Sequence, residues 1–302
     1  MTKNLSKLIS FLTVLSLFIS PEISLAQKNS PKLAIKQIIQ SSKGTIGVAV
    51  IGLEDNFSMT MNDNKRFTMH SVYKFPLALA VLDQVDKGKL SLDQKLRVTK
   101  NDLLPNTWSP LRDEYPNGGA ISLSDLLGYT VSMSDNNGCD FLFRLLGGTK
   151  NVQTYIRNLG VKGISIAATE EEVAKDWPVQ YTNWSRPSAM LRLMVNAYRG
   201  KYLSKSSNDF LWKIMRETST GPNRIKGLLP AGTVVAHKTG TSGTNDKGLT
   251  PATNDVGIVT LPNGKHFAVV VFVSDSTDDQ KTREGVIARI TKVVWDYYLA
   301  KS

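Results

Sequence analysis

The sequence predicts an α/β (α+β) fold in which both chain ends build one antiparallel sheet flanked by helices, with an all-helical lobe inserted between them. Two observations support it. Strand-like segments occur near the start (45–53 and 58–62) and near the end (233–237, 256–261 and 266–274), whereas the middle has mostly helical patterns. Because strands bury their apolar faces in shared sheets, the simplest fold pairs the two ends. We expect one intertwined unit, with an α/β lobe from residues 27–66 and 219–302 and a helical lobe from residues 67–218.

The first 26 residues have the pattern of a secretory signal peptide. Lys3 and Lys7 precede an apolar run at 8–19, and Ser24-Leu25-Ala26 supplies the small residues of a cleavage site. A membrane anchor is the alternative, but a bilayer-spanning helix needs about 20 apolar residues, more than this run has. We therefore predict cleavage after Ala26, export to the periplasm, and no membrane partner for the mature protein.

From residue 30 onward the expected elements follow in order. Ser30 and Pro31 open a helix with a cap and a first-turn proline, and the strands at 45–53 and 58–62 form a hairpin. A capping pattern at Ser122 starts one helix of the middle, and the other helical segments are 71–86, 140–146, 149–159, 187–198 and 208–218. The segment 164–186 has little periodicity and predicts a long loop, which is usually functional. Asn263-Gly264 predicts a tight turn between the last two strands, and 282–299 closes the chain as a helix.

The composition is that of an ordinary globular protein and indicates neither a metal nor a cofactor. Of the 302 residues, 41% are hydrophobic and 21% are charged. The net charge is +11, or +10 without the signal, but the basic residues are scattered, without the runs that favour nucleic-acid binding. The three His residues lack metal-ligand spacing. The single cysteine, Cys139, lies in an apolar helical run and is expected to be a buried packing residue rather than a nucleophile.

Ser71 and Lys74 form the first candidate catalytic pair. A serine hydroxyl becomes a useful nucleophile only when a base accepts its proton. On a helix, residues i and i+3 share a face with Cβ atoms roughly 5–6 Å apart, so Lys74 can reach the Ser71 hydroxyl. Burial and a second cation would lower the pKa of this lysine into a useful range. Ser-x-x-Lys also arises by chance, so the pair carries little weight alone.

Two further polar motifs can complete that pair. Ser134-Asp135-Asn136 is a turn entering a helix, in which Ser134 can relay a proton and Asn136 can bind both a substrate amide and the lysine. Helix capping alone also explains such residues. Lys238-Thr239-Gly240-Thr241 ends a strand and would bring a cation, close backbone approach and a backbone N–H donor to a substrate. An ordinary strand end followed by a turn is the alternative.

Together, and in this order, the three motifs resemble those of the class A serine β-lactamases, over essentially all of the mature sequence. The likeness is greatest to the branch that contains the extended-spectrum PER-type and CfxA-type enzymes. It also rests on the continuation of the second motif to Asp140 and on segments 104–110, 179–184 and 253–257. The resemblance implies a hydrolase that opens the β-lactam amide of penicillins and cephalosporins, favours cephalosporins, needs no cofactor and confers antibiotic resistance.

The resemblance also implies a role for each matching residue. The reacting groups are Ser71 as nucleophile, Lys74 or Glu170 (through a water) as its base, Ser134 as proton donor to the leaving nitrogen, and Lys238 as neighbouring cation. The backbone N–H groups of Ser71 and Thr241 form the oxyanion hole. The substrate-binding residues are Asn136, Thr239, Gly240, Thr241, Arg224 and Trp108. Arg224 replaces a carboxylate-binding arginine whose usual position holds Val256, and Trp108 lines the mouth of the cleft.

Three acids in the predicted loop compete for the role of deacylating base: Glu170, Glu171 and Glu172. Counting back from Val179-Gln180-Tyr181 assigns the family's base to Glu170. Many enzymes of the class hold the same water with an Asn four residues further on, where this chain has Ala174. The deacylating water must then be held differently.

Two other functions share the three motifs. A D-Ala-D-Ala peptidase of cell-wall synthesis lacks the deacylating glutamate. A β-lactam sensor acylates and stops, and usually adjoins a transmembrane segment, which the sequence after the signal lacks. We therefore expect the hydrolase, acting as a monomer on a small-molecule β-lactam and without a nucleic-acid partner.

Overall fold

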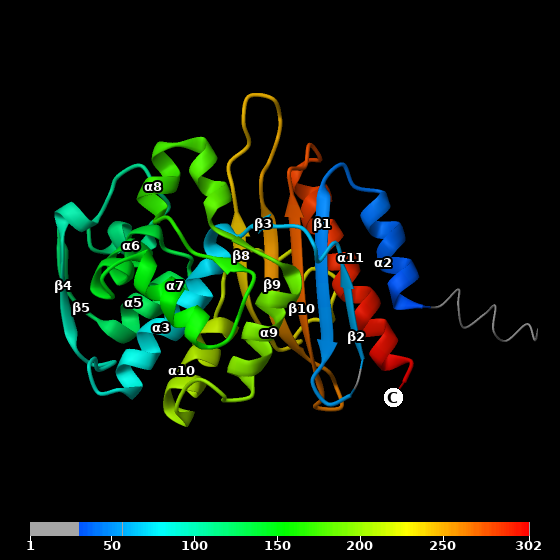
Figure 1. Ribbon diagram of the computed structural model, residues 1–302, viewed down its shortest axis with the longest axis horizontal. Coiled ribbons are helices and arrows are strands. Elements are labelled where there is room, and N and C mark those ends of the chain that lie inside the picture. Colours follow the sequence, from blue (N-terminus) through cyan, green and yellow to red (C-terminus); the bar gives the residue numbers. More distant parts are fainter. Residues whose placement is uncertain (1–29, 56, 302) are drawn as a thin grey trace, which may run out of the picture.

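The computed structural model describes residues 30–55 and 57–301, so the predicted signal at 1–26 lies outside the described residues. Strands gather near both ends of the described chain, and most of the helices lie between them (Figure 1). In chain order they are α2 (Pro31–Gln40), β1 (Thr45–Gly52), β2 (Ser58–Met61), β3 (Phe67–Thr68), η1 (His70–Tyr73), α3 (Lys74–Asp86), β4 (Lys95–Thr99), η2 (Lys100–Asp102), α4 (Pro110–Glu114), β5 (Gly118–Ser122), α5 (Leu123–Ser132), α6 (Asn136–Leu145), α7 (Thr149–Asn158), β6 (Ile164–Ser165), α8 (Glu170–Lys175), η3 (Trp177–Thr182), β7 (Trp184–Ser185), α9 (Pro187–Tyr198), α10 (Lys205–Arg216), β8 (Val235–Thr241), β9 (Thr253–Thr260), β10 (His266–Ser274) and α11 (Gln280–Leu299).

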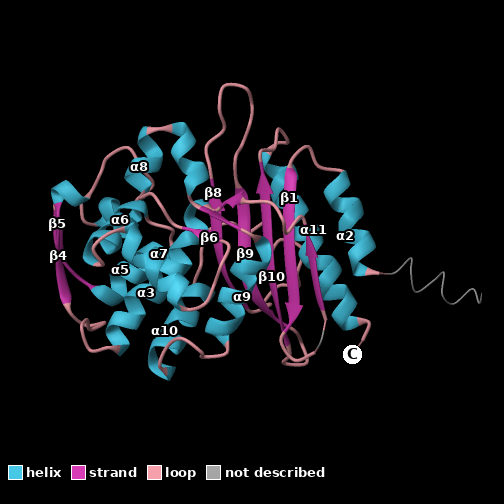
Figure 2. Ribbon diagram, in the orientation of Figure 1, coloured by secondary structure: helices cyan, strands magenta, loops and turns pink. Residues whose placement is uncertain are grey.

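A five-stranded antiparallel sheet joins the two ends of the chain. Its strand order is β2-β1-β10-β9-β8, and Figure 2 shows it beside the helical part of the molecule. β1 pairs with β10 from Thr45↔Ser274 to Gly52↔Phe267, so the ends lie side by side as predicted. The β9–β10 turn contains Gly264 at φ 78°, a left-handed conformation that favours glycine. The predicted fold class is confirmed, while the exact lobe boundaries stay a prediction.

Both faces of this sheet are buried, as β10 shows. Val269 and Val271 belong to an apolar cluster with residues of α2 and α11, whereas Val270 and Phe272 belong to a second cluster with the helical part. Side chains alternate across a strand, so a strand covered on both sides reads as a continuous apolar run. The helices α2 and α11 therefore cover one face, and α9 with the helical part covers the other (Figure 1).

The inserted part of the chain is organised around α3, which is buried from Lys74 to Leu82. It is not all-helical, contrary to the prediction. β4 and β5 pair antiparallel, and β3, β7 and β6 form a small sheet. The sequence signal for β4 was missed because the strand is short and only its fourth residue, Val98, is buried.

The predicted loop at 164–186 also differs from expectation, because it contains the short helix α8 and the turn η3. Helices of about six residues are too short to show an apolar period. α6 begins at Asn136, four residues before the predicted start, because the side chain of Asp135 caps it by accepting from Gly138 N over 2.7 Å. Among the described residues, none of the helices has the length and apolar character needed to cross a bilayer.

Candidate active site

Ser71 lies in the turn η1, which leads directly into α3. This turn packs against β8, so the serine lies where the helical part meets the edge of the sheet. Lys74 is the first residue of α3 and is fully buried. Its Nζ donates a hydrogen bond to Ser71 Oγ over 2.9 Å, as the spacing of the two residues predicts.

The Lys74 amine has more oxygen neighbours than protons. Besides Ser71 Oγ, it lies 2.9 Å from Ser134 O, 2.5 Å from Asn136 Oδ1 and 2.9 Å from Glu170 Oε1. An ammonium has three N–H donors. A neutral amine would instead donate to two of the oxygens and accept the Ser71 proton. The geometry therefore allows a proton to move between Ser71, Lys74 and Glu170.

The three side chains of the Ser134-Asp135-Asn136 motif have different partners. Ser134 has φ 60° and its Oγ accepts from Lys238 Nζ over 2.9 Å, while Asn136 Nδ2 donates to Thr107 Oγ1 over 2.6 Å. Asp135 is fully buried. Its carboxylate accepts from Ser109 Oγ, Leu111 N and Gly138 N at 2.9, 2.7 and 2.7 Å. Ser134 and Asn136 thus reach the site, and Asp135 holds the turn.

The third motif runs along the edge strand β8. Lys238 is fully buried, and this burial, with the charge of Lys74, holds its pKa well below the ordinary value of 10.5. Thr239 Oγ1 lies 2.5 Å from Thr220 Oγ1. A Cβ at Gly240 would lie 2.3 Å from the Met69 carbonyl oxygen, so the glycine is needed for close approach to the turn before Ser71.

Of the three competing acids, Glu170 is the one that reaches Ser71. Its Oε1 lies 3.5 Å from Ser71 Oγ. Glu171 pairs with Lys175 over 2.7 Å on the surface, and Glu172 Oε2 accepts from Thr169 N over 2.8 Å as a helix cap. Burial is the largest single effect on the pKa of Glu170 and raises it. The charge and hydrogen bond of Lys74, together with smaller effects of neighbouring groups, outweigh burial, so the pKa is lowered below 4.5 and the carboxylate is ionised at neutral pH.

Asp140, on α6, fixes the start of α8. Its two carboxylate oxygens accept from Glu170 N and Glu171 N, each over 2.8 Å. Negative charge is favourable at a helix N-terminus, where backbone N–H groups lack partners. Burial and the charge of Glu170 raise the pKa of Asp140 to about 7. Sequence reasoning quoted Asp140 within the second motif but gave it no role.

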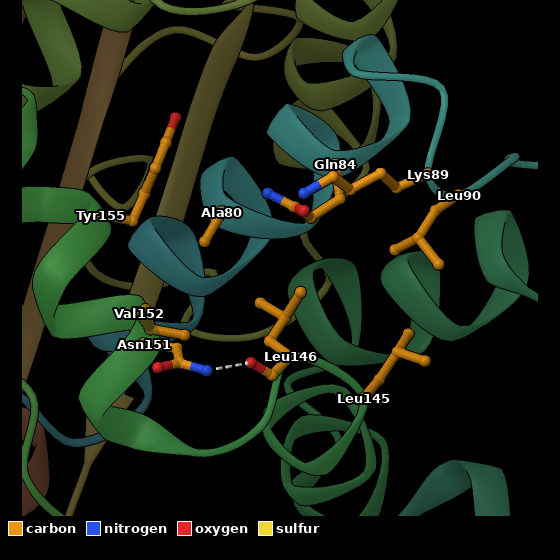
Figure 3. A pocket seen from close by; sticks show the side chains of 9 residues that line it. All are labelled: Ala80, Gln84, Lys89, Leu90, Leu145, Leu146, Asn151, Val152 and Tyr155. Atoms are coloured by element: carbon orange, nitrogen blue, oxygen red, sulfur yellow. Dashed lines mark hydrogen bonds between the residues drawn. The ribbon is translucent and has the colours of Figure 1, made fainter.

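A cavity of about 250 Å³ opens beside Glu170, between the 104–107 segment and α8. Asn136 and Ala174 also line it. The apolar Ala174 methyl cannot hydrogen-bond a water. A separate pocket of about 390 Å³ between α3, α6 and α7 contains none of the predicted site residues (Figure 3).

Arg224 and Trp108 lie at two different depths. Arg224 is 3% exposed, and its guanidinium donates to Gly240 O at 3.2 Å, Thr241 Oγ1 at 2.7 Å and Glu284 Oε1 at 3.2 Å. It therefore lies directly behind the end of β8. Trp108 is 61% exposed, and its Nε1 donates to Met133 O over 2.9 Å.

Sequence reasoning missed the residues that hold the predicted site residues in position. Glu284 pairs with Arg224, and Thr107 holds Asn136. His70, next to Ser71, contacts the side chain of Gln180 over 2.9 Å. The only sequence signal for His70 was its position beside the nucleophile, because a partner 110 residues away leaves no local pattern.

The comparisons with known proteins agree with one another. A model of the β-lactamase enzyme family matches residues 30–298. The chain is 48% identical to the β-lactamase VEB-1 of Pseudomonas aeruginosa over 96% of this chain and 97% of that protein. It is 43% identical to the extended-spectrum β-lactamase PER-1 of the same organism, over 91% of this chain and 90% of that protein.

Solved structures show the same relationship. The crystal structure of a β-lactamase from Chitinophaga pinensis is 58% identical, with a TM-score of 0.88, covering 89% of this chain and 99% of that chain. A class A β-lactamase from Bacteroides cellulosilyticus is 40% identical, with a TM-score of 0.85, covering 90% of this chain and 99% of that chain. The resemblance to the PER-type branch is confirmed.

Proposed function

The chain belongs to the class A serine β-lactamases of the β-lactamase enzyme family, and from that premise we propose that it hydrolyses β-lactams through an acyl-enzyme on Ser71. Hydrolysis of β-lactams confers resistance to them. One observation carries the mechanistic proposal. Ser71 Oγ lies 2.9 Å from Lys74 Nζ and 3.5 Å from Glu170 Oε1, so one hydroxyl has two candidate proton acceptors.

In the first half of the reaction, Ser71 Oγ attacks the β-lactam carbonyl carbon and loses its proton to Lys74, or to Glu170 through a water. The carbonyl oxygen becomes an oxyanion, for which the backbone N–H groups of Ser71 and Thr241 are the proposed donors. Collapse of this intermediate breaks the amide C–N bond and leaves an ester on Ser71.

The leaving nitrogen needs a proton, and Ser134 is its proposed donor. Ser134 Oγ accepts from Lys238 Nζ over 2.9 Å, and its carbonyl oxygen accepts from Lys74 Nζ over the same distance. Ser134 can therefore pass its hydroxyl proton to the nitrogen and regain one from a lysine. Lys238 and Arg224 supply positive charge for the substrate carboxylate, Asn136 and Thr239 bind polar groups, Gly240 lies along the substrate, and Trp108 lines the mouth.

In the second half, water hydrolyses the ester and releases the opened lactam from Ser71. Glu170 accepts a proton from the water, the resulting hydroxide attacks the ester carbon, and Ser71 leaves with a proton returned by Lys74 or Glu170. General-base catalysis of this kind contributes typically about 10²–10⁴-fold. The lowered pKa of Glu170 keeps the carboxylate ionised for this step.

Cephalosporins are the proposed preferred substrates, supported by the likeness to an extended-spectrum enzyme, and we further propose a monomer exported to the periplasm. The test mixes purified protein with a chromogenic cephalosporin and follows product per enzyme. We expect many turnovers. A single stoichiometric burst would indicate a sensor, and activity confined to a D-Ala-D-Ala peptide would indicate a peptidase; either result overturns the proposal.

A further inference from the structure

The side chain of His70 connects the turn η1, which contains Ser71, to the turn η3, which follows the helix α8 that begins at Glu170. His70 immediately precedes Ser71, and its Nε2 lies 2.9 Å from Oε1 of Gln180 in η3. Gln180 is 4% exposed, so this contact is sheltered from water. The mechanism described above gives neither residue a role.

The direction of this hydrogen bond follows from the other end of Gln180. Its Nε2 donates to Trp177 O over 2.8 Å, which orients Oε1 toward His70. Rotating the amide would place two oxygens against each other at Trp177 and is unfavourable. Since Oε1 only accepts, His70 Nε2 must carry the proton. Burial lowers the pKa of His70, so the neutral imidazole protonated on Nε2 fits this site.

The backbone on both sides reinforces the same connection. Thr68 Oγ1 donates to Gln180 O over 2.5 Å, and Met69 N donates to Asn183 O over 2.9 Å. His70 follows these residues with φ 45°, a left-handed conformation that is unfavourable for most residues with a Cβ. The turn is therefore held in an uncommon conformation, with the imidazole aimed at η3.

Acylation and deacylation depend on the His70–Gln180 contact to different degrees. Ser71 and Lys74 belong to η1 and α3, so their contact does not involve the segment 164–186. Glu170, in contrast, is carried by α8, which is followed immediately by η3. Asp140 holds the start of α8, so a shift of η3 would act on Glu170 through the other end of this short helix, while Ser71 and Lys74 stay in register.

We propose that His70 is a positioning residue for deacylation: by donating from Nε2 to Gln180, it fixes the Glu170-bearing segment to the residue next to the nucleophile. This inference rests on the proposed acyl-enzyme mechanism. It predicts that loss of the imidazole slows release of the acyl-enzyme more than its formation.

Two variants of His70 form a matched pair. In His70→Gln the side-chain N–H reaches about as far as Nε2 does, so the donor is kept. In His70→Asn the amide stops short of Gln180, although Asn tolerates the left-handed backbone well. Reduced activity in the Asn variant would therefore come from the lost contact, not from backbone strain.

The experiment measures acylation and deacylation rate constants separately, by rapid mixing with a chromogenic cephalosporin and by mass spectrometry of trapped acyl-enzyme. We expect His70→Asn to slow deacylation by about a hundredfold, the typical effect of a misplacement of about 1 Å, with acylation changed less than about threefold. His70→Gln should recover most of the loss. If His70→Asn fails to fold, Gln180→Leu applies the same test from the other side of the contact.

Equal losses in both steps, equal losses in both variants, or wild-type deacylation in His70→Asn would each overturn the inference. Glu170→Gln separates this result from a failure of the proposed function. If Glu170→Gln accumulates acyl-enzyme but His70→Asn does not, only the inference about His70 fails. If no acyl-enzyme forms on Ser71 in any variant, the acyl-enzyme mechanism itself fails.

Discussion

Lys74 Nζ and Glu170 Oε1 lie 2.9 Å apart, with the lysine side chain fully buried and the glutamate side chain 10% exposed. A charge removed from water in this way is stable only with a partner, because desolvation strongly disfavours the ionised form. The pair therefore holds a base and a cation within reach of one hydroxyl. The two residues are 96 positions apart in the sequence, so this relationship exists only in the folded chain.

The first prediction concerns the Glu170 carboxylate. Glu170→Gln keeps the size of the side chain but removes the base that activates water for deacylation. We expect acyl-enzyme to accumulate and the deacylation rate constant to fall by about 10²–10⁴-fold. Mass spectrometry after mixing with a cephalosporin would show protein carrying the opened lactam on Ser71.

The neighbouring acids supply matched controls. Glu171 pairs with Lys175 on the surface and Glu172 caps α8, so neither carboxylate faces Ser71. Glu171→Gln and Glu172→Gln should turn over at close to the wild-type rate. Accumulation of acyl-enzyme in Glu172→Gln instead would show that the base is assigned to the wrong residue.

The second prediction is the acid limb of the pH profile. The base works as a carboxylate, so deacylation is lost as pH falls through the pKa of Glu170. That pKa is lowered from 4.5, since Lys74 and the other groups around the carboxylate together outweigh the effect of burial. The acid limb of the single-turnover deacylation rate should therefore have its midpoint below pH 4.5.

Asp140 is the group that can disturb this profile. Its pKa is raised to about 7, so its carboxylate becomes protonated as pH falls through neutrality, weakening its hold on Glu170 N and Glu171 N. If the deacylation rate falls near pH 7 in the wild type but not in Asp140→Asn, the acid limb is due to Asp140. That result would contradict the prediction that protonation of Glu170 sets this limb.

The third prediction is the alkaline limb. In the proposed mechanism Lys238 attracts the substrate carboxylate only while it is protonated, and burial together with Lys74 holds its pKa well below 10.5. kcat/KM should therefore fall as pH rises, beginning below pH 10.5. In Lys238→Arg this limb should move to higher pH, because a guanidinium stays charged to a pH above about 12. An unchanged limb in the Arg variant would assign it to another group.

The fourth prediction separates structure from chemistry within Ser134-Asp135-Asn136. Asp135→Ala removes the acceptor for Leu111 N, Gly138 N and the Ser109 hydroxyl, all within the fold. Each buried donor left without a partner costs about 1–3 kcal/mol, so we expect the free energy of unfolding to fall by about 3 kcal/mol or more. Urea denaturation measures the change.

Asn136→Ala is the companion variant. Its side chain contacts Lys74 and Thr107 at the site, so it should reduce turnover much more than it reduces stability. Comparable stability losses in the two variants would contradict this division of the motif.

The sequence predicts the frame of this protein better than its details. Long segments were found because their patterns are local: α9 begins and ends where the sequence predicts, and the Asn263-Gly264 turn joins β9 and β10. Short elements were missed. β4 has one buried residue and β5 begins with two glycines, so neither shows the alternation by which strands are recognised.

The sequence likewise predicted some residues of the candidate site and not others. Ser71, Lys74, Ser134 and Lys238 were named from short motifs, and the structure brings them together. Glu284 has no motif, and Gln180, although it lies in a segment that carries the family resemblance, was given no role, because the partners of both residues lie on distant elements. The resemblance to a known family selected Glu170 from three adjacent acids, which composition and spacing alone left open.

The last prediction tests whether Arg224 binds substrate or only supports β8. Its ion pair with Glu284 is buried on both sides, at 4% and 8% side-chain exposure. Arg224→Met removes the ion-pair partner of the buried Glu284 charge, a change that typically costs about 3–5 kcal/mol. Adding Glu284→Met removes that charge, so the double variant should recover part of the lost stability in urea denaturation.

The substrate-binding role is then read from KM in the double variant. If the guanidinium attracts the cephalosporin carboxylate, KM stays raised even where stability recovers, because the attracting charge is still missing. The ratio of the KM of the double variant to that of the wild type should also be smaller at high salt, because ions screen the attraction between the wild-type guanidinium and the substrate carboxylate. A KM that returns to the wild-type value together with stability would show that Arg224 acts only by holding Gly240 and Thr241 in place.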